Sequence, residues 1–418
     1  MRYEIVKIHL KKFGHFWALV LTFVFASTFA NDVFAFTPQQ LYDNVWRIVN
    51  TKYVDETNNQ QNWDRWRHKY DAYIKTDEDA YVAIDTMLAS LNDPYTKFLN
   101  PKEFAEETSS IKGSLKGIGI QIAVKEGKLL VIAPMEDTPA EKAGLLAEDE
   151  IVEINGESTK GITVDKAADK IRGEEGTSVV LTIKRKNQPL KKYTIKRAEI
   201  IIKAVSTKVP NNVVLDNSVG YIRLSSFISK NAREEFLTAL TNLGDKKGYI
   251  IDLRSNPGGL LSNAITMSDM FIDGGVIVST VDRDGYKDTT RATRRYITDK
   301  PVVVLINKGS ASASEIFSGA LKDNQRALIV GETSFGKGLV QEVNKLPNGS
   351  GMNITIQKYL TPNGTDINKK GITPDVEVKL TDKDVENKND AQLKKANELI
   401  LTMIKNETTD VSTTTISN

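Results

Sequence analysis

A strand, a glycine turn and a helix follow one another between residues 302 and 323, and this order constrains the chain more than any other stretch. The run Val302–Ile306 is apolar and β-branched, as buried strands are. Residues 307–309 form a predicted turn, and apolar residues then recur with the spacing of one helix face. A serine at such a corner is a common nucleophile, because helix-start N–H groups beside it can stabilise an oxyanion.

A catalytic serine needs a base, and histidine is nearly excluded by number. The chain has three histidines, of which His9 and His15 lie in a predicted targeting segment and His68 lies in a charged, helical stretch. Lysine is the other known partner, and it must be neutral, which burial favours by lowering its pKa. Lys337 stands alone between Phe-Gly and Gly-Leu, which suits this requirement. A solvated loop lysine beside serines that only cap a helix fits the spacing equally well.

Three strings in this region occur together in one known family. They are S-A-S-A-S-E-I at residues 310–316, A-L-K-D at 320–323 and T-S-F-G-K-G-L-V-Q at 333–341. The stretch resembles the catalytic core of the carboxyl-terminal processing proteases, also called tail-specific proteases, which use a Ser-Lys dyad. The family usually has T-F-G-K-G, and the variation here leaves the lysine in place.

The resemblance implies roles for five residues. Ser312 would be the nucleophile and Lys337 the general base, and they stand 25 positions apart, as in the family. Glu315 and Gln341 match polar residues that orient the dyad in relatives. Asp323 matches an acidic residue that some relatives need.

A phosphate-binding loop competes for the same lysine. Residues 331–337, G-E-T-S-F-G-K, fit the pattern G-x-x-x-x-G-K, which requires Ser or Thr next and then a helix. Here Gly338 follows, and the residues after it alternate like a strand. We therefore predict no nucleotide site.

Composition limits the remaining functions. A chain of 418 residues predicts two or three domains. Cysteine is absent, which excludes disulfides, thiolate metal sites and a cysteine nucleophile, and the scarcity of histidine makes zinc unexpected. The net charge of +2 does not favour nucleic acid. We expect no metal and no cofactor.

The N-terminus has the layout of a secretory signal peptide. Residues 1–15 are basic, residues 16–29 are mostly apolar, and the small residues Ala30 and Ala35 follow. Cleavage after either alanine is expected, so that the signal peptide is 1–30 or extends to 35. An uncleaved anchor is the alternative. Either way the body is exported, which predicts the bacterial periplasm or cell envelope, with transient or peripheral membrane association.

Residues 37–108 are helical in pattern. Thr37 precedes Pro38 as a helix cap, and apolar residues then recur at helical spacing. The aromatic residues in this region are expected in the core rather than in a ligand box. The string L-N-D-P-Y-T-K-F-L-N-P at residues 91–101 ends the region and also resembles the family.

Residues 111–197 are β-rich and resemble a PDZ domain. The order is a G-I-G-I loop, alternating strands, an Asn155-Gly156 turn and a short helix. The resemblance implies that a peptide adds as a strand and that its terminal carboxylate binds N–H groups of one loop. That loop would be Gly117, Ile118, Gly119 and Ile120. A plain β-domain with ordinary glycine turns is the alternative.

Residues 204–380 alternate strand, helix and strand, which predicts a parallel α/β catalytic domain. The R-S-N-P-G-G string at 254–259 and the serine corner both follow strands, where sites gather. The resemblance implies an oxyanion hole from the N–H groups of Gly258 and Ala313. From the spacing alone, N-P-G-G is an ordinary turn. Residues 381–418 predict one helix, at 391–404, and a disordered tail.

The predicted fold class is α+β multidomain, with an N-terminal helical region, an inserted PDZ domain and an α/β core. The predicted function is an exported serine endopeptidase that binds the unstructured carboxyl-terminal tail of an envelope protein and cuts nearby. A PDZ adaptor without catalysis that tethers such tails is the alternative. The family further implies an adaptor partner and assembly into a homo-oligomer.

Overall fold

The structure is a computed structural model, and it describes residues 36–135, 137–210, 212–387 and 389–415. The described residues from Thr37 onward form one compact unit. The predicted signal peptide and its cleavage sites lie outside the described residues. Within the described ranges, no helix combines the length and the apolar content that crossing a membrane requires.

Three helices form the N-terminal region: α1 (Pro38–Lys52), the 3-10 helix η1 (Trp63–Trp66) and α2 (Asp77–Ala89). Thr37 caps α1 as predicted, since its hydroxyl accepts the N–H of Gln40. Trp46 and Trp63 are buried, and each indole N–H donates to the other residue's carbonyl. These aromatic residues pack in the core, as the sequence predicts.

A sheet connects this region to the predicted catalytic core. Its strand order is β1-β18-β13-β14, and β17 pairs with β18. The strands are β1 (Lys97–Leu99), β13 (Val276–Asp282), β14 (Lys287–Arg291), β17 (Leu339–Lys345) and β18 (Gly351–Leu360), and α3 (Pro101–Lys112) follows β1. β17 pairs with β18 in antiparallel orientation. Because β1 pairs with β18, the 91–101 string lies close to the catalytic core.

The predicted PDZ domain is a five-strand sheet in the order β3-β4-β5-β7-β8, with β6 added to β5. Its elements are β3 (Ile120–Lys125), β4 (Lys128–Pro134), α4 (Pro139–Lys142), β5 (Glu150–Ile154), β6 (Glu157–Ser158), α5 (Val164–Ile171), β7 (Ser178–Lys184) and β8 (Lys191–Lys196). A separate pair, β2 (Ser114–Gly117) and β9 (Ala198–Ile201), flanks the sheet in sequence. Asn155 and Gly156 have φ of 51° and 83°, which confirms the predicted tight turn.

The core sheet of the catalytic domain has the order β10-β11-β12-β15-β16-β19, and it is parallel from β11 onward. The strands are β10 (Val205–Ser206), β11 (Val219–Leu224), β12 (Gly248–Asp252), β15 (Val302–Ile306), β16 (Leu328–Gly331) and β19 (Val376–Glu377). The predicted alternation of strand and helix is confirmed.

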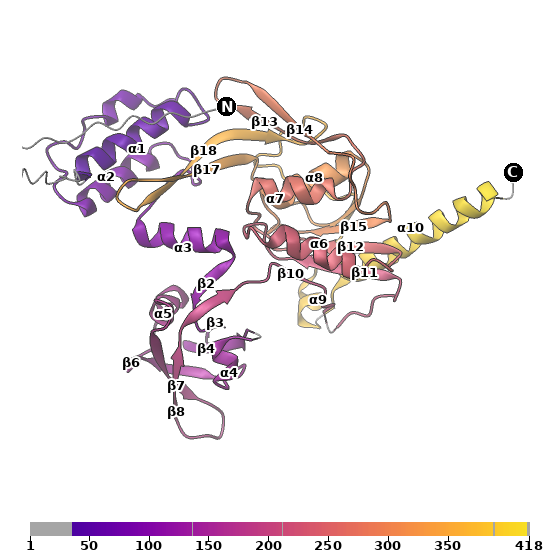
Figure 1. Cartoon of the computed structure of the whole chain (residues 1–418), viewed down its shortest axis with the longest axis horizontal. Coiled ribbons are helices and arrows are strands. Elements are labelled where there is room, and N and C mark those ends of the chain that lie inside the picture. The colour runs from indigo at the N-terminus through magenta and orange to yellow at the C-terminus, as the bar shows by residue number, and fades with distance from the viewer. Residues whose placement is uncertain (1–35, 136, 211, 388, 416–418) are drawn as a thin grey trace, which may run out of the picture. The chain divides into compact units, whose positions relative to one another are not determined.

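Helices cover both faces of this sheet (Figure 1). Along β15, Val302, Val304 and Ile306 face one apolar cluster, while Val303 and Leu305 face the other. The first cluster contains α6 (Ala232–Asn242), α7 (Leu261–Asp269) and α8 (Ala313–Asp323), and the second contains α10 (Ala391–Thr415).

An aromatic cluster anchors the predicted nucleophile helix α8. Phe317 is fully buried, and its ring lies 5.9 to 6.3 Å from the rings of Phe227, Phe236 and Phe271. Every residue of α8 from Ala313 to Leu321 is buried. The start of this helix is therefore held by the core rather than by a mobile loop.

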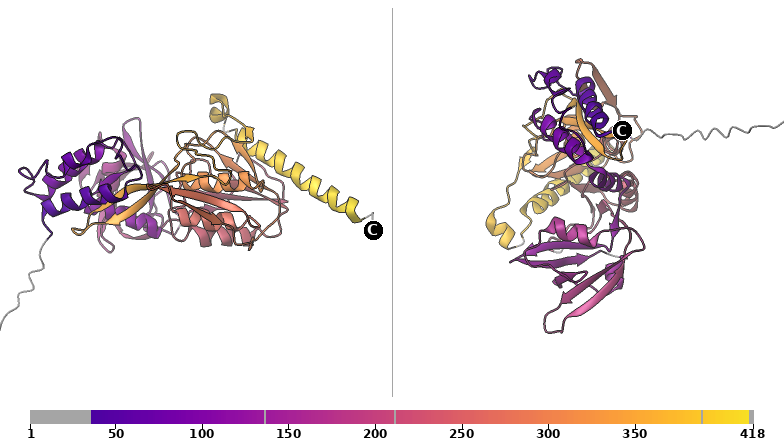
Figure 2. Two further views of the ribbon diagram at one scale, coloured as in Figure 1. Left: turned by 90° about the horizontal axis from the view of Figure 1, so that it is seen from above. Right: turned by 90° about the vertical axis from the view of Figure 1, so that its left-hand side faces the viewer.

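The C-terminal helix is longer than the sequence predicts. After α9 (Asp382–Glu386), α10 continues to Thr415, across the segment expected to be disordered. Figure 2 shows α10, in yellow, beginning beside the core sheet and running on past it. The docked first half explains the difference, because extending a formed helix is far easier than nucleating one.

Candidate active site

The candidate site lies where β12 and β15, neighbours in the parallel sheet, reach their carboxyl ends. The R-S-N-P-G-G loop follows β12, and the serine turn follows β15. A cavity of about 420 Å³ opens there, and its lining includes Ser312, Lys337, Gln341, Gly258 and Ala313. The structure thus brings together five of the residues that the sequence analysis singled out.

The structure distinguishes among the three serines of the S-A-S-A-S string. Ser310 and Ser314 are fully buried, and their hydroxyls donate to the carbonyl oxygens of Leu253 and Asn256 at 2.8 and 2.9 Å. Ser312 is the one of the three that lines the cavity. Geometry therefore singles out the same serine as the family resemblance.

Ser312 has an unusual backbone conformation at the start of α8. Its φ is 53° and its ψ is −114°, a region that residues with a side chain seldom occupy. Gly258 makes this turn possible, because a Cβ at that position would come within 2.9 Å of the Ser312 Cβ. A strained strand-to-helix turn that exposes a serine is the arrangement of a nucleophile elbow.

The buried carboxylate of Glu315 joins the serine turn to the lysine loop. One oxygen accepts the N–H groups of Ser312 and Lys337 at 2.8 and 2.9 Å. The other oxygen accepts the Ser334 hydroxyl at 2.5 Å and the Gly336 N–H at 2.7 Å. Four donors to a fully buried carboxylate compensate for its burial and fix both backbones relative to each other.

Lys337 is half-buried, and its amine lies over the ring of Tyr95, 4.5 Å from the ring centre. Burial lowers the pKa of Lys337 below the usual value for lysine. Among the described residues, no hydrogen bond connects the Lys337 amine to the Ser312 hydroxyl. The two side chains share one cavity, but the amine rests on the aromatic ring.

Tyr95 and Tyr359 are site residues that the sequence patterns did not predict. Tyr95 is positioned by the D-P-Y-T turn, in which Asp93 accepts the Tyr95 N–H at 3.0 Å. The Tyr359 hydroxyl on β18 donates to the Ser312 carbonyl at 3.2 Å, and burial raises its pKa. The 91–101 string was noticed as family-like, so a signal for Tyr95 was present, whereas Tyr359 lies in an ordinary strand pattern.

The two proposed oxyanion donors differ in the structure. The Ala313 N–H is the first of helix α8 and has no acceptor among the described residues. The Gly258 N–H instead donates to the Asn256 side-chain oxygen at 2.9 Å. In this conformation the Gly258 N–H is therefore occupied, although the residue lines the cavity.

Gln341 and Asp323 occupy different surroundings. Gln341 lines the cavity on β17, and its amide donates to the Thr355 hydroxyl at 3.3 Å. Asp323 lies at the far end of α8 from Ser312, where it accepts the Asn363 N–H at 2.9 Å. The structure does not bring Asp323 to the cavity, because it lies eleven positions after the serine along a helix, about 16 Å away.

The predicted PDZ domain has an open groove beside its edge strand β3. A cavity of about 230 Å³ is lined by Gly117, Ile118, Gly119 and Ile120 on one side and by α5 on the other. Gly119 has a φ of 78°, and a Cβ there would collide with the Thr138 side chain at 2.4 Å. The four predicted residues therefore lie together at a groove that suits an added peptide strand.

Within the described ranges, no group of three or more His, Cys, Asp or Glu side chains is arranged to hold a metal ion. The charged groups at the catalytic cavity are instead single side chains from different elements.

Family models match two parts of the chain. The model for Peptidase family S41 matches residues 218–378, and the PDZ domain model matches residues 130–185. Fold and site together define a peptidase of the S41 class that carries a PDZ domain.

Individual relatives show to which group within this class the chain belongs. The chain is 43% identical over 365 residues to the carboxyl-terminal-processing protease of Picosynechococcus sp., across 85% of this chain and 87% of the relative. It is 40% identical over 376 residues to the protein of that name from Synechocystis sp., across 87% and 88%. It is also similar to the solved photosystem II D1 C-terminal processing protease, with 35% identity, a TM-score of 0.55 and coverage of 82% and 94%. The chain belongs to the carboxyl-terminal-processing proteases, and it is thus a hydrolase that acts on peptides.

Proposed function

We propose that this protein is an exported serine endopeptidase with Ser312 as nucleophile and Lys337 as general base. In this proposal the PDZ groove binds the unstructured carboxyl-terminal tail of an envelope protein, and the catalytic site cuts nearby. The observation that carries the proposal is the Glu315 carboxylate, which binds the N–H groups of Ser312 and Lys337 beside one cavity.

In the first step, neutral Lys337 accepts the proton of the Ser312 hydroxyl as the serine oxygen attacks the scissile carbonyl. Burial supports this role because it lowers the pKa of Lys337 and so increases the neutral fraction of the amine. The amine must first leave the Tyr95 ring, so the structure corresponds in this proposal to a resting arrangement.

The oxyanion forms beside the start of α8. The Ala313 N–H, which has no acceptor among the described residues, is one donor. The Gly258 N–H becomes the second donor when it turns from Asn256 toward the substrate oxygen. The tetrahedral intermediate then collapses, and the leaving amine takes the proton that Lys337 holds.

Water completes the cycle. Lys337, neutral again, accepts a proton from a water molecule that attacks the acyl-enzyme. The ester bond breaks, the new carboxyl terminus leaves, and the proton returns to the Ser312 oxygen. The remaining proposed residues position the catalytic groups. Glu315 holds the loop that carries Lys337, and Gln341 holds β17. Asp323 holds the far end of α8.

The test is cleavage of a protein substrate with a flexible carboxyl-terminal tail by Ser312→Ala, measured by mass spectrometry. We expect no cleavage and an unchanged melting temperature. Ser318→Ala is the matched control, because Ser318 is buried in the same helix and its hydroxyl has no partner among the described residues. This control should cleave normally.

Cleavage at the normal rate by Ser312→Ala would refute the mechanism. If the wild-type protein itself bound tailed substrates without cutting them under any condition, the adaptor alternative would replace the protease proposal.

A further inference from the structure

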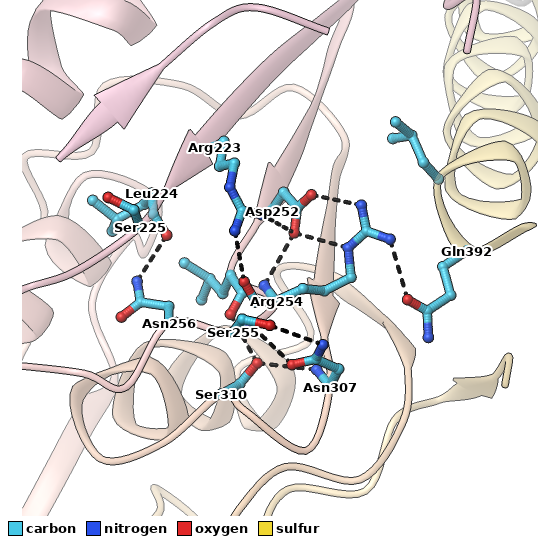
Figure 3. A network of polar contacts seen from close by, with 12 residues as sticks. Arg223, Leu224, Ser225, Asp252, Arg254, Ser255, Asn256, Asn307, Ser310 and Gln392 are labelled. Atoms are coloured by element: carbon cyan, nitrogen blue, oxygen red, sulfur yellow. Dashed lines mark hydrogen bonds and ion pairs between the residues drawn. The ribbon is translucent and has the colours of Figure 1, made fainter. Parts of the chain in front are cut away.

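A buried polar network lies beneath the R-S-N-P-G-G loop (Figure 3). Asp252, at the end of β12, is fully buried and forms an ion pair with Arg254 at 2.7 Å. Arg223 adds a second ion pair to Asp252 at 3.3 Å and donates to the Arg254 carbonyl at 3.0 Å. Tyr221 donates to the same carboxylate at 2.9 Å. The backbone and the side chain of Arg254 are both held at the entrance of the loop.

The C-terminal helix supplies the other half of this network. Asp390 precedes α10, and its two oxygens accept the two terminal nitrogens of Arg254 at 2.8 and 2.9 Å. The same side chain caps α10 by accepting the Leu393 N–H at 2.9 Å. Gln392, also fully buried, accepts from Arg254 at 3.2 Å. Arg254 is thus the point at which α10 is attached to the loop.

From Arg254 the network continues into the serine turn. The Ser255 N–H donates to the Asn307 side chain at 2.7 Å, across the two neighbouring loops. One residue further on, the Asn256 carbonyl accepts the Ala311 N–H at 3.0 Å and the Ser314 hydroxyl at 2.9 Å. These bonds lie on both sides of Ser312 in the sequence.

Asn256 also controls the oxyanion side. Its side-chain oxygen holds the Gly258 N–H, and its amide donates to the Leu224 carbonyl at 2.8 Å. A short run of the loop, from Arg254 to Gly258, therefore carries contacts from α10 at one end and the oxyanion glycine at the other.

We propose that Arg254 and Asp390 form a positioning pair through which docking of the C-terminal helix sets the geometry of the oxyanion loop and the serine turn. The pair does not touch substrate. Its effect passes through Ser255 and Asn256 to the residues around Ser312, and the inference therefore rests on the proposed role of Ser312.

The charge arrangement supports positioning rather than simple stabilisation. The Arg254 side chain is 11% exposed and already has a fully buried partner in Asp252, so its charge is compensated without α10. Asp390 orients the Arg254 guanidinium, because a bidentate contact between a guanidinium and a carboxylate fixes the plane of both groups. Hydrogen bonds and charge from Arg254 and Arg223 outweigh the effect of burial and lower the pKa of Asp252.

The experiment is Asp390→Asn in the full chain, assayed for kcat and KM on a tailed substrate. Asparagine caps helices as well as aspartate, so α10 keeps its start while the two-pronged ionic contact is lost. We expect kcat to fall about 10-fold to 100-fold, as small misplacements of catalytic groups do, with KM unchanged. Affinity for a peptide boronate, which mimics the tetrahedral intermediate, should fall in parallel.

Asp375→Asn is the matched control, at an exposed position of the same domain. Asp375 pairs with Lys322 at 2.8 Å and accepts the Ile329 N–H at 2.8 Å, and it lies outside the network. The kcat of Asp375→Asn should remain within about 2-fold of wild type, since substitutions at surface positions usually have small effects. Asp390→Glu, which restores the charge, should recover part of the lost kcat.

Normal kcat and normal boronate affinity in Asp390→Asn would overturn the inference while leaving the Ser312 mechanism intact. An equal loss of kcat in Asp375→Asn would also overturn it, because the effect would then be general. Cleavage by Ser312→Ala would instead refute the proposed function itself.

Discussion

The serine turn and the lysine loop are held by the same carboxylate, yet the structure prepares them to different degrees. Glu315 binds the N–H groups of Ser312 and Lys337 at nearly equal distances. Ser312 is the N-cap of α8, whose residues from Ala313 to Leu321 are buried, so its backbone determines where the hydroxyl lies. The Lys337 amine stands at the end of a long side chain and rests on Tyr95.

This difference indicates which part of the site can be regulated. A backbone fixed by buried hydrogen bonds does not rearrange cheaply. A lysine side chain changes rotamer easily, and an amine resting against an aromatic ring gives up little when it leaves. The nucleophile is therefore preorganised, while alignment of the base remains open to control.

Replacing Lys337 should have the largest effect. Lys337→Ala removes the base, and Lys337→Arg replaces it with a group that does not lose its proton, so both should lower kcat by roughly 10²-fold to 10⁴-fold. The measurement is single-turnover cleavage of a tailed substrate. Lys345→Arg, at an exposed residue of β17, is the control and should cleave at the normal rate. Substantial activity in Lys337→Arg would show that the base is another residue, and the contrast between a fixed Ser312 and a mobile Lys337 would then not describe the catalytic pair.

Glu315→Gln should have the next largest effect, because it removes the carboxylate that binds N–H groups of both the serine turn and the lysine loop. The amide group of glutamine would face N–H donors, so two of the four hydrogen bonds, each worth about 1.5–3 kcal/mol, would be lost. We expect kcat/KM to fall about 100-fold and the melting temperature to fall by about 5 °C or more.

Calorimetry and kinetics on the same sample measure both quantities for Glu315→Gln. Glu342→Gln removes an exposed pairing with Lys52 and should change neither. If Glu315→Gln lowered stability but left kcat/KM intact, the shared carboxylate would be structural only.

Replacing Tyr95 should have the smallest effect, which is a shift in the pH dependence of activity. Activity should rise with pH as Lys337 loses its proton, and burial places this rise below the usual lysine pKa of about 10.4. The Tyr95 ring favours the charged amine, so Tyr95→Leu should lower the pKa further and move the rise to lower pH by about half a unit to one unit. Tyr95→Phe keeps the ring face and should match wild type.

The pH dependence of kcat/KM for the three proteins gives the comparison. The other ionisable groups that act on Lys337 are unchanged in both variants; they are Asp93, Lys97, Glu107 and Glu315. Coincident profiles for Tyr95→Leu and wild type would mean that the ring does not influence the base.

Much of the fold follows from local patterns. The strand Val302–Ile306 and the helix after it were predicted from periodicity, since a buried strand and a one-faced helix each leave a clear spacing. The alternation after Gly338 likewise predicted a strand, which the structure shows as β17. The C-terminal helix was predicted too short, because its second half has a polar composition that gives no helical period.

The candidate site was predictable in its residue types but not in its contacts. Ser312, Glu315 and Lys337 were identified from strings that recur in a family, and the structure places them together. Tyr95 and Asp390 were not identified, because each acts across more than a hundred residues of sequence. A local pattern contains no information about such a partner.

The sequence by itself determined most of the elements and the residues able to perform serine chemistry, because these depend on spacing and side-chain type. Tertiary structure alone decided that Gly258 donates to Asn256, that Lys337 rests on Tyr95 and that α10 is tied to Arg254. The physical reason is that burial and pairing determine the protonation and the direction of a polar group, and both depend on segments distant in the chain.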